Sequence, residues 1–157
     1  MLIRDTVIGD RKALAEILEF TANLTDEEKK CAVELLDIYL NDPFQKDYFF
    51  MTALDGSGRP AGYVCYGPRP LAEAVYDLYW IVVAPERRNT GVGRTLLEKT
   101  VEVLAEKGAR MLAAETSGLP AYEAARGFYL KSGFTEEARI REFYKPGDDL
   151  VVYIRRF

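Results

Sequence analysis

One stretch of the sequence, residues 75–115, restricts the fold more than any other, because it predicts a strand, a helix and a second strand in succession. The first strand is the apolar, β-branched run Val75–Val83, and a turn with two glycines follows it. The helix covers residues 91–106, and the second apolar strand covers Arg110–Glu115. Because a crossover of this kind joins parallel neighbours in a sheet, the sequence predicts a βαβ unit.

The turn Arg88–Gly93 directly precedes the predicted helix and has the properties of an anion site. A helix start carries unpaired N–H groups and a partial positive charge. Gly91 and Gly93 also lack the Cβ atoms that would keep a ligand from the backbone. Asn89 and Thr90 are the only side chains placed to cap the helix, so a bound phosphate would complete its first turn. The alternative is a tight turn whose glycines only relieve crowding.

Two motifs carry a family resemblance. The turn has the pattern R-x-x-G-x-G, but Leu96 and the absence of G-K-[ST] leave the dinucleotide and nucleoside-triphosphate motifs incomplete. Downstream, Ala125–Phe134 has the pattern A-x-x-F-Y-x-x-x-G-F. In this order the two motifs resemble those of the GCN5-related N-acetyltransferase (GNAT) family. The family often has Asn at the position of Tyr122, three residues before the Ala of the second motif. The polar contact that such an Asn would make to the cofactor is therefore not assigned here.

The resemblance implies that acetyl-CoA is the acetyl donor. Backbone N–H groups of the turn would hold its pyrophosphate, and the main chain near the end of the first strand would pair with pantetheine. The Val83 N–H would polarise the thioester carbonyl. Arg87, Arg88 and Arg94 would also reach the 3′-phosphate, although a solvated helix face explains Arg87 and Arg94 equally well. The residues assigned to acetyl-CoA are Ile81, Val82, Val83, Arg88, Asn89, Thr90, Gly91, Val92, Gly93 and Arg94.

The same resemblance makes Tyr129 the general acid that protonates the departing thiolate. A tyrosine beside Phe128 is otherwise expected to be an aromatic core residue. Proton transfer from a phenol of pKa about 10 to a thiolate of conjugate-acid pKa about 8.5 is uphill by roughly 2 kcal/mol. A modestly lowered pKa of Tyr129 would remove that cost.

Two carboxylates are candidates for the base that deprotonates the acceptor ammonium. Asp77 alternates onto the same strand face as Tyr79 and Val83, where the histone-acetylating branch of the family has a Glu. The pKa values of a model Asp and an alkylammonium differ by an amount equivalent to roughly 9 kcal/mol. As a base, Asp77 must therefore have a pKa raised by burial, or it must act through a water molecule. Glu115 at the end of the next strand is the competing base, and it would otherwise cap the following turn. Asp77 is preferred.

The acceptor is predicted to be a small-molecule amine, because Asp77, Glu115 and Asp149 would form an acidic mouth lined by Tyr79 and Tyr144. The Asp149 segment is equally well explained as turn chemistry. Acetylation of a protein N-terminus or lysine is the alternative activity, and a non-catalytic acyl-CoA-binding module is the alternative class. No cysteine lies in either motif, which favours direct transfer in a ternary complex.

Composition limits the remaining possibilities. With 157 residues, 48% of them apolar, the chain is expected to form a single N-acetyltransferase domain over residues 1–157. There are 21 basic and 25 acidic residues, so neither nucleic acid nor an anionic membrane is an expected partner. No membrane span or signal peptide is recognisable, and a cytoplasmic location is expected. The family resemblance allows a homodimer.

Histidine is absent, which excludes catalysis by a histidine base and the H-E-x-x-H zinc motif. No metal is therefore expected. Cys31 and Cys65 lie in apolar stretches and are predicted to be buried and reduced.

The rest of the chain supplies the remaining elements of an α/β (α+β) fold. The predicted strands besides the βαβ pair are Leu2–Val7, Tyr48–Leu54, Ala61–Tyr66, Thr135–Phe143 and Leu150–Arg155. Helices are predicted after Asp10, from the capping box that begins at Thr25, and over Tyr122–Lys131. The prediction, which the resemblance also implies, is a GNAT-like, mostly antiparallel sheet of about seven strands with a central parallel pair and about four helices.

Overall fold

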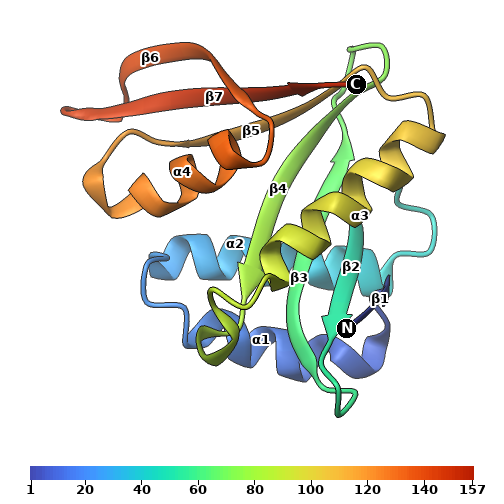
Figure 1. The fold of residues 1–157 in the computed structure, drawn as a ribbon. Helices are drawn as coiled ribbons and strands as arrows, with labels where there is room; N and C mark the ends of the chain where they lie inside the picture. The colour runs from blue at the N-terminus through green and yellow to red at the C-terminus, as the bar shows by residue number, and fades with distance from the viewer. The chain divides into compact units, whose positions relative to one another are not determined.

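The computed structural model describes residues 1–157 and confirms the predicted fold class. The seven strands form one mixed sheet in the order β1-β2-β3-β4-β5-β7-β6, in which β4 and β5 are parallel (Figure 1). The strands are β1 (Leu2–Asp5), β2 (Phe49–Leu54), β3 (Pro60–Pro68), β4 (Val75–Val83), β5 (Met111–Ser117), β6 (Thr135–Lys145) and β7 (Asp148–Arg156).

Four α-helices accompany the sheet, namely α1 (Arg11–Glu19), α2 (Asp26–Asn41), α3 (Val92–Glu106) and α4 (Glu123–Lys131). The capping box predicted for α2 is present, because Glu28 N donates to Thr25 Oγ1 (3.1 Å) and Thr25 N donates to Glu28 Oε2 (2.7 Å). Gly108 after α3 and Gly133 after α4 have φ values of +73° and +84°, as glycines that end helices commonly do. No helix is long and apolar enough to cross a membrane.

The chain divides into two compact units, and β4 contributes residues to both. The first unit consists of residues 1–67 and 79–104, and the second consists of residues 68–78 and 105–157.

The first unit has its core between the sheet and helices α1 and α2. Leu14, Leu18 and Leu36 from these helices are fully buried against Phe50 of β2 and Tyr63 of β3. In Figure 1, α3 lies in front of β2 and β3, and α1 and α2 lie behind them. The unit is therefore a three-layer arrangement in which both faces of these strands are covered.

On the α3 side, Gly62 of β3 permits a close approach of neighbouring segments. A Cβ atom built on Gly62 would lie 2.7 Å from Val82 O and 3.2 Å from Val92 Cγ1. Because no side chain fits there, β3 lies directly against the end of β4 and the first residue of α3.

The buried hydroxyl of Tyr63 has no hydrogen-bond partner. A buried unsatisfied polar group costs about 1–3 kcal/mol, so Tyr63→Phe should raise the free energy of unfolding by about 1 kcal/mol, as measured by urea denaturation. The matched control is Tyr39→Phe: Tyr39 also packs on Phe50 (5.2 Å), but its hydroxyl donates to Thr6 O (3.2 Å), so this variant should lose stability. Equal losses in both variants would contradict the prediction.

The second unit contains the start of β4 together with β5, β7 and β6. The turn chemistry expected near Asp149 is present, because Pro146 and Gly147 form the turn between β6 and β7. β7 begins at Asp148, two residues before the predicted Leu150, so Asp149 itself lies in the strand. β6 carries a bulge before this turn. Ile140 pairs with Leu150 and Lys145 pairs with Asp148, so residues 141–144 lie opposite Asp149 alone.

The prediction that both cysteines are buried was half right. Cys65 is buried in β3, but Cys31 is exposed on α2, and neither forms a disulfide. The neighbours of Cys31 in sequence are apolar only on its C-terminal side, and the helix turns the cysteine away from Ala32, which is fully buried.

Candidate active site

The predicted anion site is an uncapped helix start in the first unit. The first backbone hydrogen bond of α3 runs from Thr95 N to Gly91 O (2.9 Å). The N–H groups of Val92, Gly93 and Arg94 precede this bond, so they have no acceptor within the helix. Three consecutive N–H groups at the positive end of a fifteen-residue helix can together hold a phosphate oxygen.

Neither of the two side chains expected to cap α3 does so. Thr90 donates from its hydroxyl to Arg87 O (2.6 Å), which stabilises the preceding turn. Asn89 has a φ of +59°, and Gly91 has a φ of +89° with open space at the position of a Cβ atom. This backbone conformation, rather than crowding, is what requires glycine at position 91.

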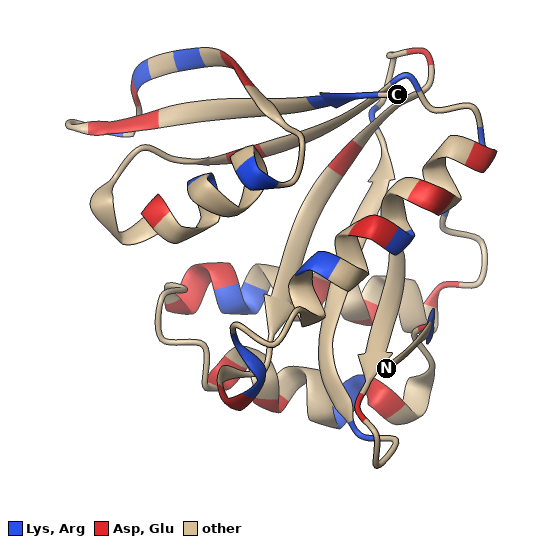
Figure 2. Ribbon diagram, in the orientation of Figure 1, with Lys and Arg blue, Asp and Glu red and all other residues tan.

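The arginines around the turn have different partners. Arg94 pairs with Glu98 along α3 (2.7 Å), a helix that carries both basic and acidic residues (Figure 2). Arg88 makes a single long hydrogen bond to Asn23 Oδ1 (3.4 Å), and its side chain is exposed. Arg88 is therefore held less tightly by other residues of the chain than Arg94, although both were predicted to contact the cofactor.

Replacing Gly91 by Val should weaken CoA binding in addition to the loss of stability that a β-branched residue at a φ of +89° brings. The open space means that the branched side chain meets no core atom, but it would lie beside the uncapped N–H groups. Hydrogen bonds to charged groups contribute about 1.5–3 kcal/mol, so calorimetry should show CoA affinity reduced by about 10- to 100-fold.

The control for this prediction is Gly108→Val at the other end of α3. Gly108 has a similar φ of +73° and open space around its Cβ position, so the backbone strain is matched. This variant should bind CoA like the parent protein. If Gly91→Val and Gly108→Val bound CoA equally well, the helix start would not be the anion site.

The register of β4 with β5 bears on the predicted pantetheine contact. It pairs Val75 with Met111, Tyr76 with Leu112 and Asp77 with Ala113, and it includes no residue of β4 after Asp77. The predicted segment from Ile81 to Val83 thus lies beyond the part of β4 that pairs with β5. Tyr79, predicted to line the acceptor site, contacts Tyr48 edge-on (5.5 Å between ring centroids).

Tyr129 lies on α4 in the second unit and is 9% exposed. Its ring packs against Phe134 (5.4 Å) and Tyr153 (5.6 Å). Burial raises the pKa of Tyr129 to about 12, the opposite of the lowered pKa on which the sequence argument relied. The phenol is consequently protonated at every ordinary pH, which a general acid requires, but it is a weaker acid than free tyrosine.

The two candidate bases, Asp77 and Glu115, meet at one guanidinium in the second unit. Arg69 Nη1 lies 3.3 Å from Asp77 Oδ1 and 3.7 Å from Glu115 Oε1. The Asp77 side chain is 10% exposed and that of Glu115 is 44% exposed. Burial raises the pKa of Asp77 above its usual value even though Arg69 acts in the opposite direction. This is the condition that the sequence analysis required of an Asp base.

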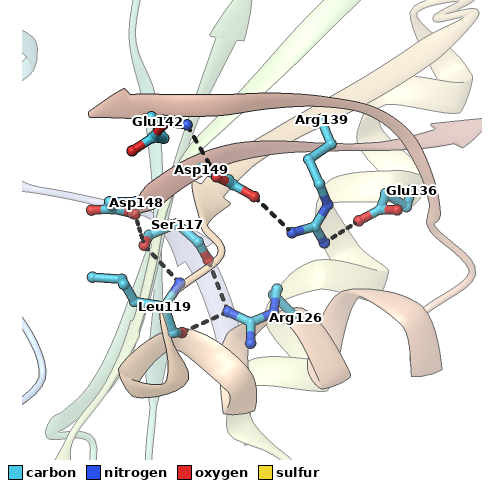
Figure 3. A network of polar contacts seen from close by, with 8 residues as sticks. All are labelled: Ser117, Leu119, Arg126, Glu136, Arg139, Glu142, Asp148 and Asp149. Atoms are coloured by element: carbon cyan, nitrogen blue, oxygen red, sulfur yellow. Dashed lines mark hydrogen bonds and ion pairs between the residues drawn. The ribbon is translucent and has the colours of Figure 1, made fainter. Parts of the chain in front are cut away.

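A polar network that the sequence analysis did not find joins β5, α4 and β7 (Figure 3). Arg126 of α4 donates from Nη1 to the carbonyl oxygens of Ser117 (2.9 Å) and Leu119 (2.8 Å). The Ser117 hydroxyl donates to Asp148 and accepts from Leu119 N (3.1 Å). Arg126 thereby fixes the helix that carries Tyr129 to the end of the strand that carries Glu115.

Asp149 and Tyr144, both predicted to contact the acceptor, lie in the β6–β7 hairpin. Asp149 accepts hydrogen bonds from Glu142 N (3.0 Å) and Arg139 Nη1 (3.4 Å), as Figure 3 shows. The backbone hydrogen bond from Glu142 is the main reason why the pKa of Asp149 is lowered. Asp149 therefore holds the bulge of β6 in place. Tyr144 is half exposed and meets Phe143 edge-on (5.3 Å).

The mixed sheet and the uncapped, glycine-containing start of α3 define an acetyltransferase. The family model of the GNAT acetyltransferases matches residues 13–134, and the chain belongs to this family. It shares 40% identity and a TM-score of 0.91 with a crystal structure assigned to the GNAT family from Desulfovibrio desulfuricans, over 99% of this chain and 98% of that one. A comparison of the sequence with curated proteins gives no significant match.

Two further solved structures are similar. A ribosomal-protein-alanine N-acetyltransferase from Brucella melitensis is 25% identical, with a TM-score of 0.76 over 100% of both chains. An aminoglycoside 6′-N-acetyltransferase complexed with coenzyme A has a TM-score of 0.77 over 99% of this chain and 97% of that one. At 15% identity, this second likeness concerns the fold alone.

Proposed function

We propose that this enzyme transfers the acetyl group of acetyl-CoA directly to a primary amine, and that the amine belongs to a small molecule. The observation that carries the proposal is the start of α3, where the N–H groups of Val92, Gly93 and Arg94 precede the first helical hydrogen bond. A pyrophosphate is the group of CoA that suits such a helix start. The likeness to a CoA-bound transferase fold supports the choice of donor.

In the proposed reaction, the helix start holds the pyrophosphate and the Val83 N–H polarises the thioester carbonyl. Asp77 accepts a proton from the acceptor ammonium, and the free amine attacks the carbonyl carbon. The C–S bond then breaks as Tyr129 gives its proton to the thiolate. The second proton of the amine nitrogen, released as the amide forms, restores the Tyr129 phenol, and Asp77 passes its proton to water. The protons are thereby accounted for without a metal or a covalent enzyme intermediate.

The proposal of a cationic acceptor rests on charge, and the size of the acceptor is what the panel of amines below tests. Asp77 and Glu115 share the single cation of Arg69, so this cluster keeps one uncompensated negative charge that favours a cationic acceptor. A protein N-terminus is the second candidate, because a 25% identical neighbour is a ribosomal-protein-alanine N-acetyltransferase.

The test measures CoA thiol release from acetyl-CoA with a panel of polyamines, amino sugars, amino acids and peptides that begin with alanine. Acetylation of a small amine with a kcat/KM well above that of any peptide is the expected result. A preference for peptides would favour the second candidate. CoA binding without turnover on any amine would instead indicate a non-catalytic binding module.

A further inference from the structure

The turn between β2 and β3 contains a carboxylate whose hydrogen bonds extend beyond the turn. Asp55 Oδ1 accepts hydrogen bonds from Ser57 N (2.9 Å), Ser57 Oγ (2.7 Å) and Arg59 N (3.1 Å). These contacts hold its side chain in one orientation and, with Ser57 as the largest cause, keep the pKa of Asp55 far below its usual value. The carboxylate is therefore ionised and fixed.

The second oxygen of this carboxylate points at the turn that precedes α3. Asp55 Oδ2 accepts a hydrogen bond from Arg87 Nη2 at 2.7 Å. The Asp55 side chain is 10% exposed and that of Arg87 is 44% exposed. Both residues belong to the first unit, although strands β3 and β4 separate them in sequence.

Arg87 is itself part of the turn that leads into α3. Its backbone N donates to Ala84 O (2.8 Å), and its carbonyl oxygen accepts from Thr90 Oγ1 (2.6 Å). The main chain of Arg87 is thus bound on both sides, and its guanidinium ties this short segment to the β2–β3 turn. Arg88 also connects the turn before α3 to another part of the first unit, through its long hydrogen bond to Asn23.

We propose that Asp55 is a positioning residue for CoA: through Arg87 it holds the turn before α3 in the conformation that leaves the helix start open to the pyrophosphate. The inference rests on the proposed function only in taking that helix start as the CoA site. The turn contains Asn89 at φ +59° and Gly91 at φ +89°, conformations that a free loop would populate only part of the time. A fixed anchor removes that cost from ligand binding.

The alternative role for this pair predicts the opposite change in CoA affinity when Asp55 is replaced. If Arg87 were a phosphate ligand that Asp55 merely restrains, removing the carboxylate would release the cation and strengthen CoA binding. If Asp55 is an anchor, removing either partner weakens binding, and removing both adds little. The direction of change in the Asp55 variant therefore distinguishes the two roles.

The experiment measures CoA affinity by calorimetry for Asp55→Asn, Arg87→Met and the double variant. Each single variant should weaken binding by about three- to tenfold, and the double variant should be no weaker than the weaker single one. Arg87→Lys retains a cation for Asp55 and should recover most of the affinity. In steady-state assays the KM for acetyl-CoA should rise by the same factor while kcat at saturation is unchanged.

Ser57→Ala is the matched control, because it removes a hydrogen bond to the same carboxylate but none to Arg87. The N–H groups of Ser57 and Arg59 still hold the carboxylate in this variant, so its CoA affinity should equal that of the parent. Unchanged or tighter binding by Asp55→Asn, or additive losses in the double variant, would overturn the inference. If Asp55→Asn were too unstable to assay, Asp55→Ser, which also removes the carboxylate, would take its place. A parent protein that bound no CoA would refute the proposed function instead.

Discussion

We expect Tyr129→Phe to lower kcat by about 10²- to 10⁴-fold, the usual contribution of a general acid, while CoA affinity and Tm stay close to those of the parent. The substitution keeps the ring that packs against Phe134 and Tyr153 and deletes only the hydroxyl. Steady-state thiol release measures kcat, calorimetry measures CoA affinity, and thermal unfolding measures Tm.

Tyr153→Phe is the appropriate control, because this neighbouring tyrosine is also buried and lies 5.6 Å from Tyr129 between ring centroids. It should leave kcat unchanged. A large kcat loss in both variants, or a loss of stability alone in Tyr129→Phe, would indicate a packing role for the Tyr129 hydroxyl.

The raised pKa of Tyr129 has a consequence for the pH dependence. With a pKa of about 12, proton transfer to a thiolate whose conjugate acid has a pKa near 8.5 is uphill by roughly 5 kcal/mol in this environment. Deprotonation of Tyr129 should therefore produce no fall in rate below about pH 11. A basic limb near neutral pH would have to come from another group.

The second large effect is expected for Asp77→Asn, which should reduce kcat/KM by about 10²-fold at neutral pH. A general base is active only when deprotonated, so the rate of the parent should rise with pH through the pKa of Asp77. Burial raises that pKa, which places this acid limb above the ordinary range of an Asp side chain. A pH–rate profile measures its position.

Arg69→Met tests the origin of this limb. The cation of Arg69 lowers the pKa of Asp77, so its removal should move the acid limb to higher pH without abolishing activity at alkaline pH. Glu115→Gln is the comparison, since Glu115 contacts the same guanidinium at 3.7 Å. If Glu115→Gln removed the limb and Asp77→Asn did not, the base would be Glu115.

Local signals in the sequence were sufficient for most of the fold. The bounds of β4 match the apolar run Val75–Val83, and α2 begins where the Thr25 capping box predicts. The parallel pairing of β4 with β5 followed from the crossover between them. These features depend on periodicity and capping, which neighbouring residues determine.

Features that depend on distant partners could not be predicted in this way. Arg69 lies in a loop with no motif, and only the fold brings it to Asp77 and Glu115. The link between Asp55 and Arg87 likewise joins separate turns. Residues 145–149 have strong turn chemistry, and the turn forms at Pro146 and Gly147, but Asp148 and Asp149 belong to β7. Turn propensity is a local preference that sheet pairing overrides.

The bulge of β6 also affects how the sheet ends. β6 is an edge strand, and its side chains are exposed along its whole length. An uninterrupted edge of this length would present a regular row of N–H and C=O groups to any other extended chain. Because residues 141–144 leave the ladder and Glu142 adopts a φ of +51°, the regular row ends near Ile140. The contacts that Asp149 makes within the hairpin therefore also protect the enzyme against strand-to-strand aggregation.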